Sequence, residues 1–322
     1  MATMVSRREF IELSSAAAVA AVLPRDAAGA SAESQGGFRG TLCLFSKPVP
    51  QLSWTELARR VKAAGFGGVD LTVRTKGHVM PARAAEDLPK AVGAIRAAGL
   101  EVPMITTELL SGDHPTAEPI VSTAAKLSIP FLKPGYYYYK FVDVRRERDE
   151  AAEQFRSLVK LTSRYGVQLG FHNHAGYIGG QLWDFAPVID ALNARDAGFY
   201  YDLDNATMEG GVAGWKIGAC LAMARMKMMA VKDFYWKQTE KGWEPFNCPL
   251  GQGMCKHAEL FRMAAAGGFH GPISLHMEFQ IPGVSDDQGI ALGREQDEQV
   301  MMAAERELRT LKSLVRAAYG EA

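Results

Sequence analysis

"RYGVQLGFHNH", residues 164–174, is the segment that decides the fold of this chain. A helix-like segment ends at Gly166, a short apolar run follows, and the run closes on two imidazoles and an amide. The same order of helix, glycine and apolar run recurs in "AAGFGGVDL" (63–71), "AAGLEVPMI" (97–105) and "AGGFHGPISL" (266–275). Because short apolar runs separated by long helices are typical of buried parallel strands, the repeated junction predicts alternating strands and helices.

Eight apolar runs are predicted to be strands of one sheet. Each is short and rich in β-branched or aromatic residues, and together they cover residues 41–46, 68–73, 102–107, 130–135, 168–174, 198–205, 228–234 and 273–279. Eight strand–helix units favour a (β/α)₈ TIM barrel over a doubly wound sheet, which usually has fewer strands. We therefore expect an α/β fold, with a single TIM barrel domain over residues 40–320 and a final amphipathic helix over residues 294–319.

The N-terminal segment differs from the rest of the chain. Arg7 and Arg8 precede a short Ala/Val-rich stretch, and "AGASA" at residues 28–32 supplies the small residues of a cleavage site. This order is typical of a twin-arginine signal peptide over residues 1–32, followed by a linker over 33–39. We expect the twin-arginine machinery as a partner, a periplasmic location, and no stable membrane span in the mature form, with a cytosolic amphipathic leader as the alternative.

The composition restricts the possible partners. Lys+Arg and Asp+Glu both number 36 in 322 residues, so the formal net charge is zero. A balanced surface offers no electrostatic footprint for nucleic acid, and a small neutral molecule such as a carbohydrate is the expected partner. The four cysteines form no CxxC pair, which leaves a disulfide and free thiols both open.

Polar side chains gather where the predicted strands end, and a TIM barrel places its active site there. The candidates are Glu108, Lys133, His172, Asn173, His174, Asp202, Asp204, Asn205, Lys232, Asp233, His276 and Glu278. Strand residues two apart share a face, so each histidine or carboxylate pair on one strand is expected to point the same way. Imidazoles and carboxylates at one rim are the ligand set for Mn²⁺, Zn²⁺ or Co²⁺, although any one of them alone is more often a capping or solvated group.

Five stretches carry a family resemblance: "LGFHNHAG", "YYDLDNATMEGG", "AVKDFYW", "CPLGQGM" and "GPISLHMEF". Over residues 40–320 the chain resembles the sugar phosphate isomerase/epimerase family of xylose isomerase-like TIM barrels, in the AP endonuclease family 2 superfamily. The resemblance implies a divalent cation held by residues of strands five to eight, usually Glu, Asp, His and Glu. It also implies that the acidic ligands move protons.

Carried over to this chain, the resemblance gives Asp202 and Glu278 as metal ligands and places His172 where relatives have a glutamate. The usual histidine of strand seven falls on Ala230, which cannot bind metal. The resemblance therefore implies a divalent metal (Mn, Zn, Co or Mg) held by His172, Asp202 and Glu278, with His276 or His174 filling the gap or the metal held weakly or not at all.

The expected reaction is a metal-assisted isomerisation or epimerisation of a sugar or keto-sugar. Glu278, His174 or His172 removes the proton next to a carbonyl to give an enediolate, and Lys232 stabilises the oxyanion or forms a Schiff base. Pairing of Lys232 with a neighbouring aspartate is an equally open interpretation. The residues expected to bind substrate are Asn205, His276, Asp204 and Trp236.

Two other functions remain open at the same site. One is a lyase or hydratase of 3-keto-glycosides, which an exported enzyme would meet more readily than phosphorylated sugars. The other is a non-catalytic secreted carbohydrate-binding barrel, which Ala230 favours. A DNA-repair endonuclease of the same superfamily needs a cluster of metal-binding histidines, and 7 histidines with zero net charge argue against it.

Overall fold

The computed structural model describes residues 37–284 and 294–320. The predicted signal over residues 1–32 lies outside the described residues, as does most of the predicted linker, so export stays a prediction. Within the described part of the chain, no helix is both long and apolar enough to cross a bilayer.

The chain alternates strands and helices throughout. The barrel strands are β1 (Leu42–Phe45), β2 (Gly68–Val73), β3 (Glu101–Thr107), β4 (Phe131–Lys133), β5 (Gln168–His172), β6 (Ala197–Asp202), β7 (Met226–Val231) and β10 (Ile273–Leu275). The helices are α2 (Trp54–Ala63), the 3₁₀ turn η1 (Pro81–Arg83), α3 (Ala84–Ala97), α4 (Ala117–Lys126), α5 (Val144–Arg164), α6 (Leu182–Asp190), α7 (Leu203–Met223), α8 (His257–Ala266) and α9 (Arg294–Tyr319).

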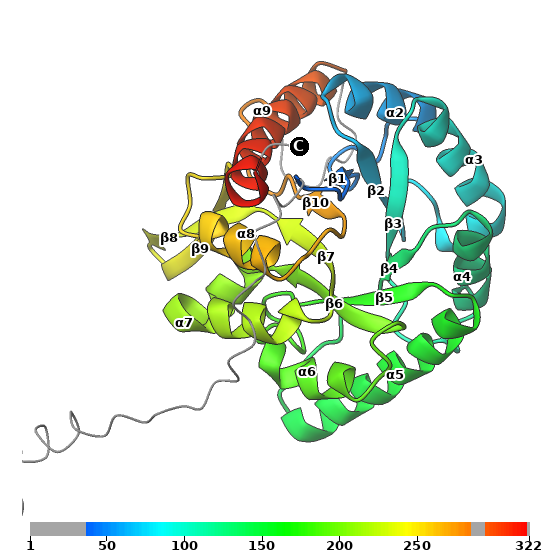
Figure 1. Ribbon diagram of the computed structural model, residues 1–322, viewed down its shortest axis with the longest axis vertical. Coiled ribbons are helices and arrows are strands. Elements are labelled where there is room, and N and C mark those ends of the chain that lie inside the picture. Colours follow the sequence, from blue (N-terminus) through cyan, green and yellow to red (C-terminus); the bar gives the residue numbers. More distant parts are fainter. Residues whose placement is uncertain (1–36, 285–293, 321–322) are drawn as a thin grey trace, which may run out of the picture. The chain divides into compact units, whose positions relative to one another are not determined.

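The strands form a closed barrel in the order β1-β10-β7-β6-β5-β4-β3-β2. Every pair of neighbouring barrel strands is parallel, and helices surround the strands in Figure 1. The predicted (β/α)₈ TIM barrel is confirmed. The predicted final helix also agrees with the limits of α9.

Local signals place the helix ends. The Ser53 side chain accepts a hydrogen bond from the Glu56 backbone N–H at 3.3 Å, which caps the start of α2. Gly65 after α2 and Gly166 after α5 have φ angles of +88° and +71°, where a side chain would be strained. The glycine at each junction therefore lets the chain leave a helix and enter the next strand directly.

Six of the predicted strands end earlier than the sequence suggested, three of them by three or four residues. The run 198–205 is strand only as far as Asp202, because the Asp202 side chain caps α7, which begins at Leu203. The run 228–234 ends as strand at Val231 and continues into an antiparallel hairpin that was not predicted, formed by β8 (Asp233–Thr239) and β9 (Gly242–Cys248). The run 273–279 is strand only as far as Leu275.

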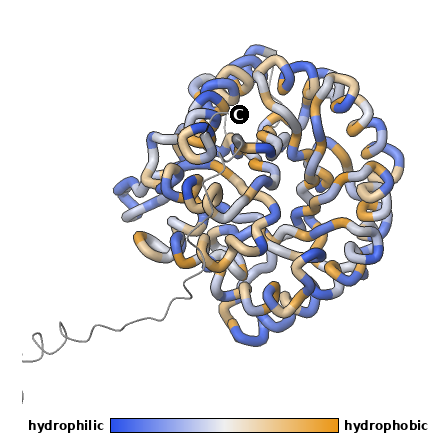
Figure 2. Tube along the Cα trace, viewed as in Figure 1, coloured by the Kyte–Doolittle hydropathy of each residue, from blue (hydrophilic) through white to orange (hydrophobic). Residues whose placement is uncertain are grey.

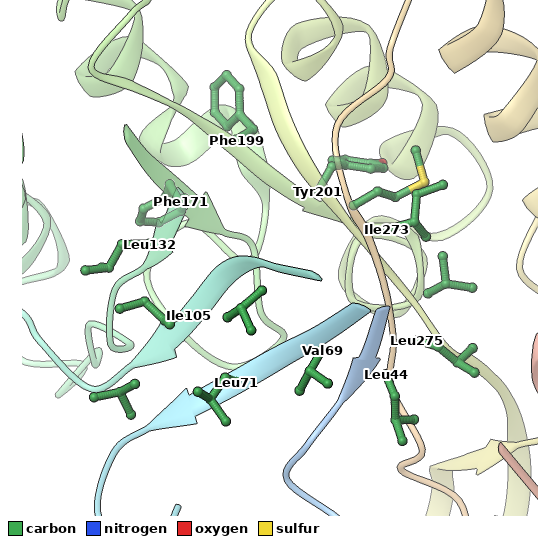
Figure 3. Packing of buried hydrophobic residues seen from close by; sticks show 14 of the residues in the cluster. Leu44, Val69, Leu71, Ile105, Leu132, Phe171, Phe199, Tyr201, Ile273 and Leu275 are labelled. Carbon is green, nitrogen blue, oxygen red and sulfur yellow. The ribbon is translucent and has the colours of Figure 1, made fainter. Parts of the chain in front are cut away.

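Alternate residues of each strand point to opposite sides of the barrel wall. The outer set packs against the helices, and Figure 3 shows Leu44, Val69, Leu71, Ile105, Leu132, Phe171, Phe199, Tyr201, Ile273 and Leu275 from seven of the strands. Figure 2 shows hydrophilic and hydrophobic residues alternating along the helices, as expected when one face meets the strands and the other meets water. The main hydrophobic core therefore lies between the barrel and the helices.

The inner set is apolar at one level and polar at the next. A small cluster of Met104, Tyr200, Met228 and Ala230 fills one level of the interior. Side chains from β2, β3, β6 and β10 also meet one another, and strands that are not neighbours can meet only inside a closed barrel. These inward positions continue toward the strand ends, where they supply the candidate site.

Candidate functional site

Asp70 is the centre of the polar level inside the barrel. It is fully buried and accepts hydrogen bonds from Thr106 at 2.8 Å, Ser274 at 2.8 Å and the Tyr200 hydroxyl at 3.2 Å. Burial raises the pKa of Asp70 to about 6, against the opposing effect of these three donors. The Tyr200 oxygen also lies 2.9 Å from His276 Nε2, so this network reaches the residues at the barrel mouth.

Lys232 lies in a ring of oxygen atoms just beyond β7. Its Nζ is 2.9 Å from Glu278 Oε2, 3.3 Å from Asn205 Oδ1 and 3.5 Å from Asp204 Oδ1. A third carboxylate, that of Asp202, has Oδ2 3.9 Å from the same nitrogen. Burial lowers the pKa of Lys232, but the three carboxylates outweigh it and hold this pKa well above its usual range.

The charge on Lys232 decides between the interpretations left open by the sequence. An amine held protonated is not a nucleophile, which argues against the Schiff base and for the ion pair. Burial raises the pKa of Glu278, but the ammonium groups of Lys232 and Lys47 outweigh it and hold this pKa well below its usual range. Glu278 is therefore an ionised carboxylate.

Asp202 is held by the start of α7. Its Oδ1 accepts the Asn205 backbone N–H at 3.0 Å, and its Oδ2 accepts the Asn205 side-chain amide at 2.7 Å. Asn173 exchanges two hydrogen bonds of 2.9 Å with the Asp202 backbone, which joins β5 to β6. Asp204 was expected on the same strand face as Asp202. It lies instead in the first turn of α7 and still reaches Lys232, because the helix follows the strand without a loop.

His172 is buried and uses both ring nitrogens. Its Nε2 lies 3.2 Å from Asp202 Oδ2, and its Nδ1 lies 3.2 Å from the Tyr136 hydroxyl. Because a carboxylate only accepts, Nε2 carries the proton and Nδ1 accepts from the tyrosine. Burial, with Lys133 nearby, lowers the pKa of His172 well below its usual range, so the ring is neutral.

A cavity of 520 Å³ opens over this arrangement. Its lining comes mainly from β1 to β5 and the segments that follow them: Phe45, Lys47, Arg74, Thr107, Glu108, Leu110, Lys133, Gly135, Tyr136, Tyr138, His174, Tyr177 and Glu278. The volume is that of a small-molecule site, and three basic residues, two acidic residues and three tyrosines line it. It therefore suits a polar molecule of the size of a sugar.

Two of the predicted catalytic residues line the cavity, Glu278 and His174. His174 Nδ1 lies 3.0 Å from the Ala175 carbonyl, which only accepts, so Nδ1 carries the proton and Nε2 carries the lone pair. Burial, followed by the charge of Lys232, lowers the pKa of His174 to about 4. His174 is therefore a neutral imidazole with one nitrogen able to accept a proton.

The other predicted site residues are not part of the described cavity lining. His172, Asp202, Asp204, Asn205, Lys232 and His276 form the buried network beside Glu278. The ring of His276 stacks on Phe45 with centroids 4.4 Å apart, and burial lowers its pKa to about 3. Trp236 lies on the β8–β9 hairpin, against Phe234, so its expected stacking on substrate has no support from the cavity.

Lys133, one of the strand-end candidates, lines the cavity, although no chemical role was predicted for it. It is 2% exposed, its Nζ lies 3.3 Å from the centroid of the Tyr136 ring, and in the described part of the chain no carboxylate oxygen lies within 4.0 Å. Burial, followed by repulsion from Arg74, lowers the pKa of Lys133 well below its usual range. Its place as the inward-pointing last residue of β4 agrees with its prediction as a strand-end candidate.

The three predicted metal ligands do not form an open metal site. Both ring nitrogens of His172 are in hydrogen bonds, and Asp202 already accepts hydrogen bonds from Asn205 and His172. Glu278 Oε2 accepts a hydrogen bond from Lys232. A metal ligand needs a free lone pair directed at the ion, and the point between these carboxylates holds an ammonium group. The donor set as arranged here therefore does not fit a divalent cation.

A different trio of potential metal ligands is formed by Asp233, Cys255 and His257. Among the described residues it is the one group of this kind whose ligand atoms all lie within 4.8 Å of one another. Asp233 already accepts from four backbone N–H groups, those of Phe234, Gly251, Gly253 and Cys255. Its oxygens are saturated, so its role is to hold the loop 249–255 against β8. The four cysteines are free thiols.

No curated protein matches the sequence. Several solved structures share its fold. A xylose isomerase-like TIM barrel protein from Mycobacterium smegmatis, in complex with magnesium, is 16% identical with a TM-score of 0.60 over 84% of this chain and 98% of that chain. A 3-keto-D-glucoside 4-epimerase from E. coli is 15% identical with a TM-score of 0.59, over 83% and 99%. D-psicose 3-epimerase from Clostridium cellulolyticum H10, with D-tagatose, is 12% identical with a TM-score of 0.62, over 85% and 99%.

The family model for the xylose isomerase-like TIM barrel matches residues 58–296, which is most of the chain. This range contains seven of the eight barrel strands and every residue of the buried Lys232 network. The chain belongs to the xylose isomerase-like TIM barrel family.

Proposed function

We propose that this protein is a sugar epimerase or isomerase, which moves a proton at the carbon next to the carbonyl of a sugar or keto-sugar. Membership of the xylose isomerase-like family supports the proposal, as does the fact that several proteins of similar structure are sugar epimerases. The observation that carries it is the cavity of 520 Å³, which Glu278 and His174 both line from the segments after β10 and β5.

The two groups supply what an epimerisation needs. The carbon–hydrogen bond breaks, its proton passes to the Glu278 carboxylate or to His174 Nε2, and the electron pair moves onto the carbonyl oxygen to give an enediolate. Return of a proton to the opposite face of that carbon, from the second group, gives the epimer. Return to the neighbouring carbon gives the isomer instead.

Cations of the cavity stabilise the enediolate. Lys47 and Arg74 line it, and a preorganised positive group near the developing oxyanion is worth several kcal/mol in a site that excludes water. Their help matters because Lys232 makes Glu278 a weak base, which by itself does not take a proton readily from carbon. A keto-sugar is favoured as substrate, since its carbonyl already acidifies the neighbouring carbon–hydrogen bond.

The lyase alternative uses the same first step. After the proton is removed, expulsion of a substituent on the β-carbon gives an unsaturated product in place of an epimer. The predicted export over residues 1–32 favours extracellular keto-glycosides as substrates for either reaction, and we propose a periplasmic location on that basis.

The test is NMR in D₂O on a panel of free ketoses, aldoses and 3-keto-glycosides. We expect deuterium at the carbon next to the carbonyl, with an inverted or moved hydroxyl group as product. Glu278→Gln should abolish exchange, whereas Glu118→Gln, at an exposed residue of α4, should leave it unchanged. An alkene signal would assign the lyase, and saturable binding without any exchange would assign the carbohydrate-binding barrel.

A further inference from the structure

The oxygen atoms around Lys232 form a cage for one cation. Glu278, Asp204, Asn205 and Asp202 place four oxygens between 2.9 and 3.9 Å from its Nζ. Carboxylate and amide oxygens gathered around one point are the ligands that hard cations take in proteins. Here the cation at that point is the Lys232 ammonium group.

The neighbouring residues agree with a built-in cation. Ala230, two residues before Lys232 on the inward side of β7, packs with Met104, Tyr200 and Met228 and offers no ligand atom. His172, across the interior on β5, donates Nε2–H to Asp202 and so supplies this carboxylate with a further hydrogen-bond donor. The interior thus directs hydrogen-bond donors at the carboxylate lone pairs that a metal ion would otherwise take.

We propose that the ammonium group of Lys232 takes the place of a divalent metal in this site, and that the protein binds no divalent ion there. Lys232 is then a positioning residue, because it holds Glu278 at the edge of the cavity and does not itself line the cavity. This role rests on the proposed function, but the occupancy of the cage does not and can be tested without substrate.

Asp204 is the carboxylate of the cage that depends most on the charge of Lys232. It is fully buried, and among the described residues neither of its carboxylate oxygens has a hydrogen-bond partner. The single close cation that the described part of the chain offers it is the Lys232 ammonium at 3.5 Å. Removing that ammonium leaves the carboxylates of Asp202, Asp204 and Glu278 around an empty volume, an arrangement that attracts a divalent cation strongly.

The experiment measures Mn²⁺ binding to EDTA-treated protein by calorimetry and by the EPR signal of free Mn²⁺. We expect no stoichiometric binding to the wild type and at least about 100-fold tighter binding to Lys232→Ala. Lys133→Ala is the matched control, because it removes another buried lysine of the interior that has no carboxylate beside it in the described chain. This control should bind Mn²⁺ no better than the wild type.

A folding defect does not obscure the result. If Lys232→Ala is unfolded without metal, recovery of its circular dichroism on adding Mn²⁺, but not on adding KCl, supports the proposal. The variant Lys232→Ala/Asp204→Asn has one buried carboxylate fewer than Lys232→Ala. It keeps the carboxylates of Asp202 and Glu278 as ligands for the ion. Stoichiometric Mn²⁺ binding by the wild type, or no gain in either variant, overturns the proposal and leaves the proposed reaction standing. Absence of solvent exchange with every sugar would instead remove the reaction and leave the cage result unaffected.

Discussion

Replacing Asp70 by asparagine should change how the stability of the protein depends on pH. The pKa of Asp70 rises from 3.8 to about 6 on folding because the carboxyl is fully buried, which corresponds to about 3 kcal/mol. A raised pKa means that the folded state binds the proton more tightly. The contribution is therefore fully present below pH 3.8 and is lost as the pH rises through 6, with about 2 kcal/mol of the loss between pH 4 and 7.

Asparagine keeps the shape of the site but does not titrate. Its carbonyl oxygen still accepts from Thr106, and the Ser274 and Tyr200 hydroxyls can turn to accept from its amide. Urea unfolding of both proteins from pH 4 to pH 8 gives the difference in free energy of unfolding, from which the other titrating groups cancel.

We expect the wild type to lose about 2 kcal/mol relative to Asp70→Asn between pH 4 and 7. Asp149→Asn, at an exposed residue of α5, is the control and should show a difference that does not vary with pH. A difference between wild type and Asp70→Asn that stays constant to within about 0.5 kcal/mol would refute the reasoning. It would mean that the three hydroxyl donors fully offset the burial of the carboxylate.

Three further predictions concern the site and its supports. Glu278→Gln should lower kcat at least about 100-fold with little change in KM, measured by NMR, since the amide fills the same space but accepts no proton; an unchanged kcat contradicts its role as base. Since the pKa of His174 is about 4, the part of kcat/KM that needs this base should fall only as the pH drops through 4, and the fall should be absent in His174→Gln. In Gly253→Ala the new Cβ would lie 2.1 Å from Asp233 Oδ1, so thermal unfolding should show a loss of at least about 2 kcal/mol, whereas Gly93→Ala, within α3 and with open space around it, should gain about 0.5 to 1 kcal/mol.

The barrel itself follows from local signals in the sequence. Junctions such as 63–71 and 164–174 indicate where a helix ends and the next strand begins. The helix end needs a glycine with positive φ, and the strand needs a run of buried residues. His172 and Asp202 point from β5 and β6 into one interior, where Lys232 and Glu278 meet them from beyond the ends of β7 and β10. The sequence also showed that Ala230 supplies no ligand atom.

Only the tertiary structure decided which of these groups meet, because hydrogen bonding across the barrel depends on distances that no local pattern contains. Asp202 could have ended a strand or capped a helix; its contact with Asn205 made it a cap and carried Asp204 onto α7. Lys232 and Lys133 are both lysines at strand ends and look alike in the sequence. One stands among three carboxylates and stays charged, while the other stands over a tyrosine ring, where burial disfavours its charge.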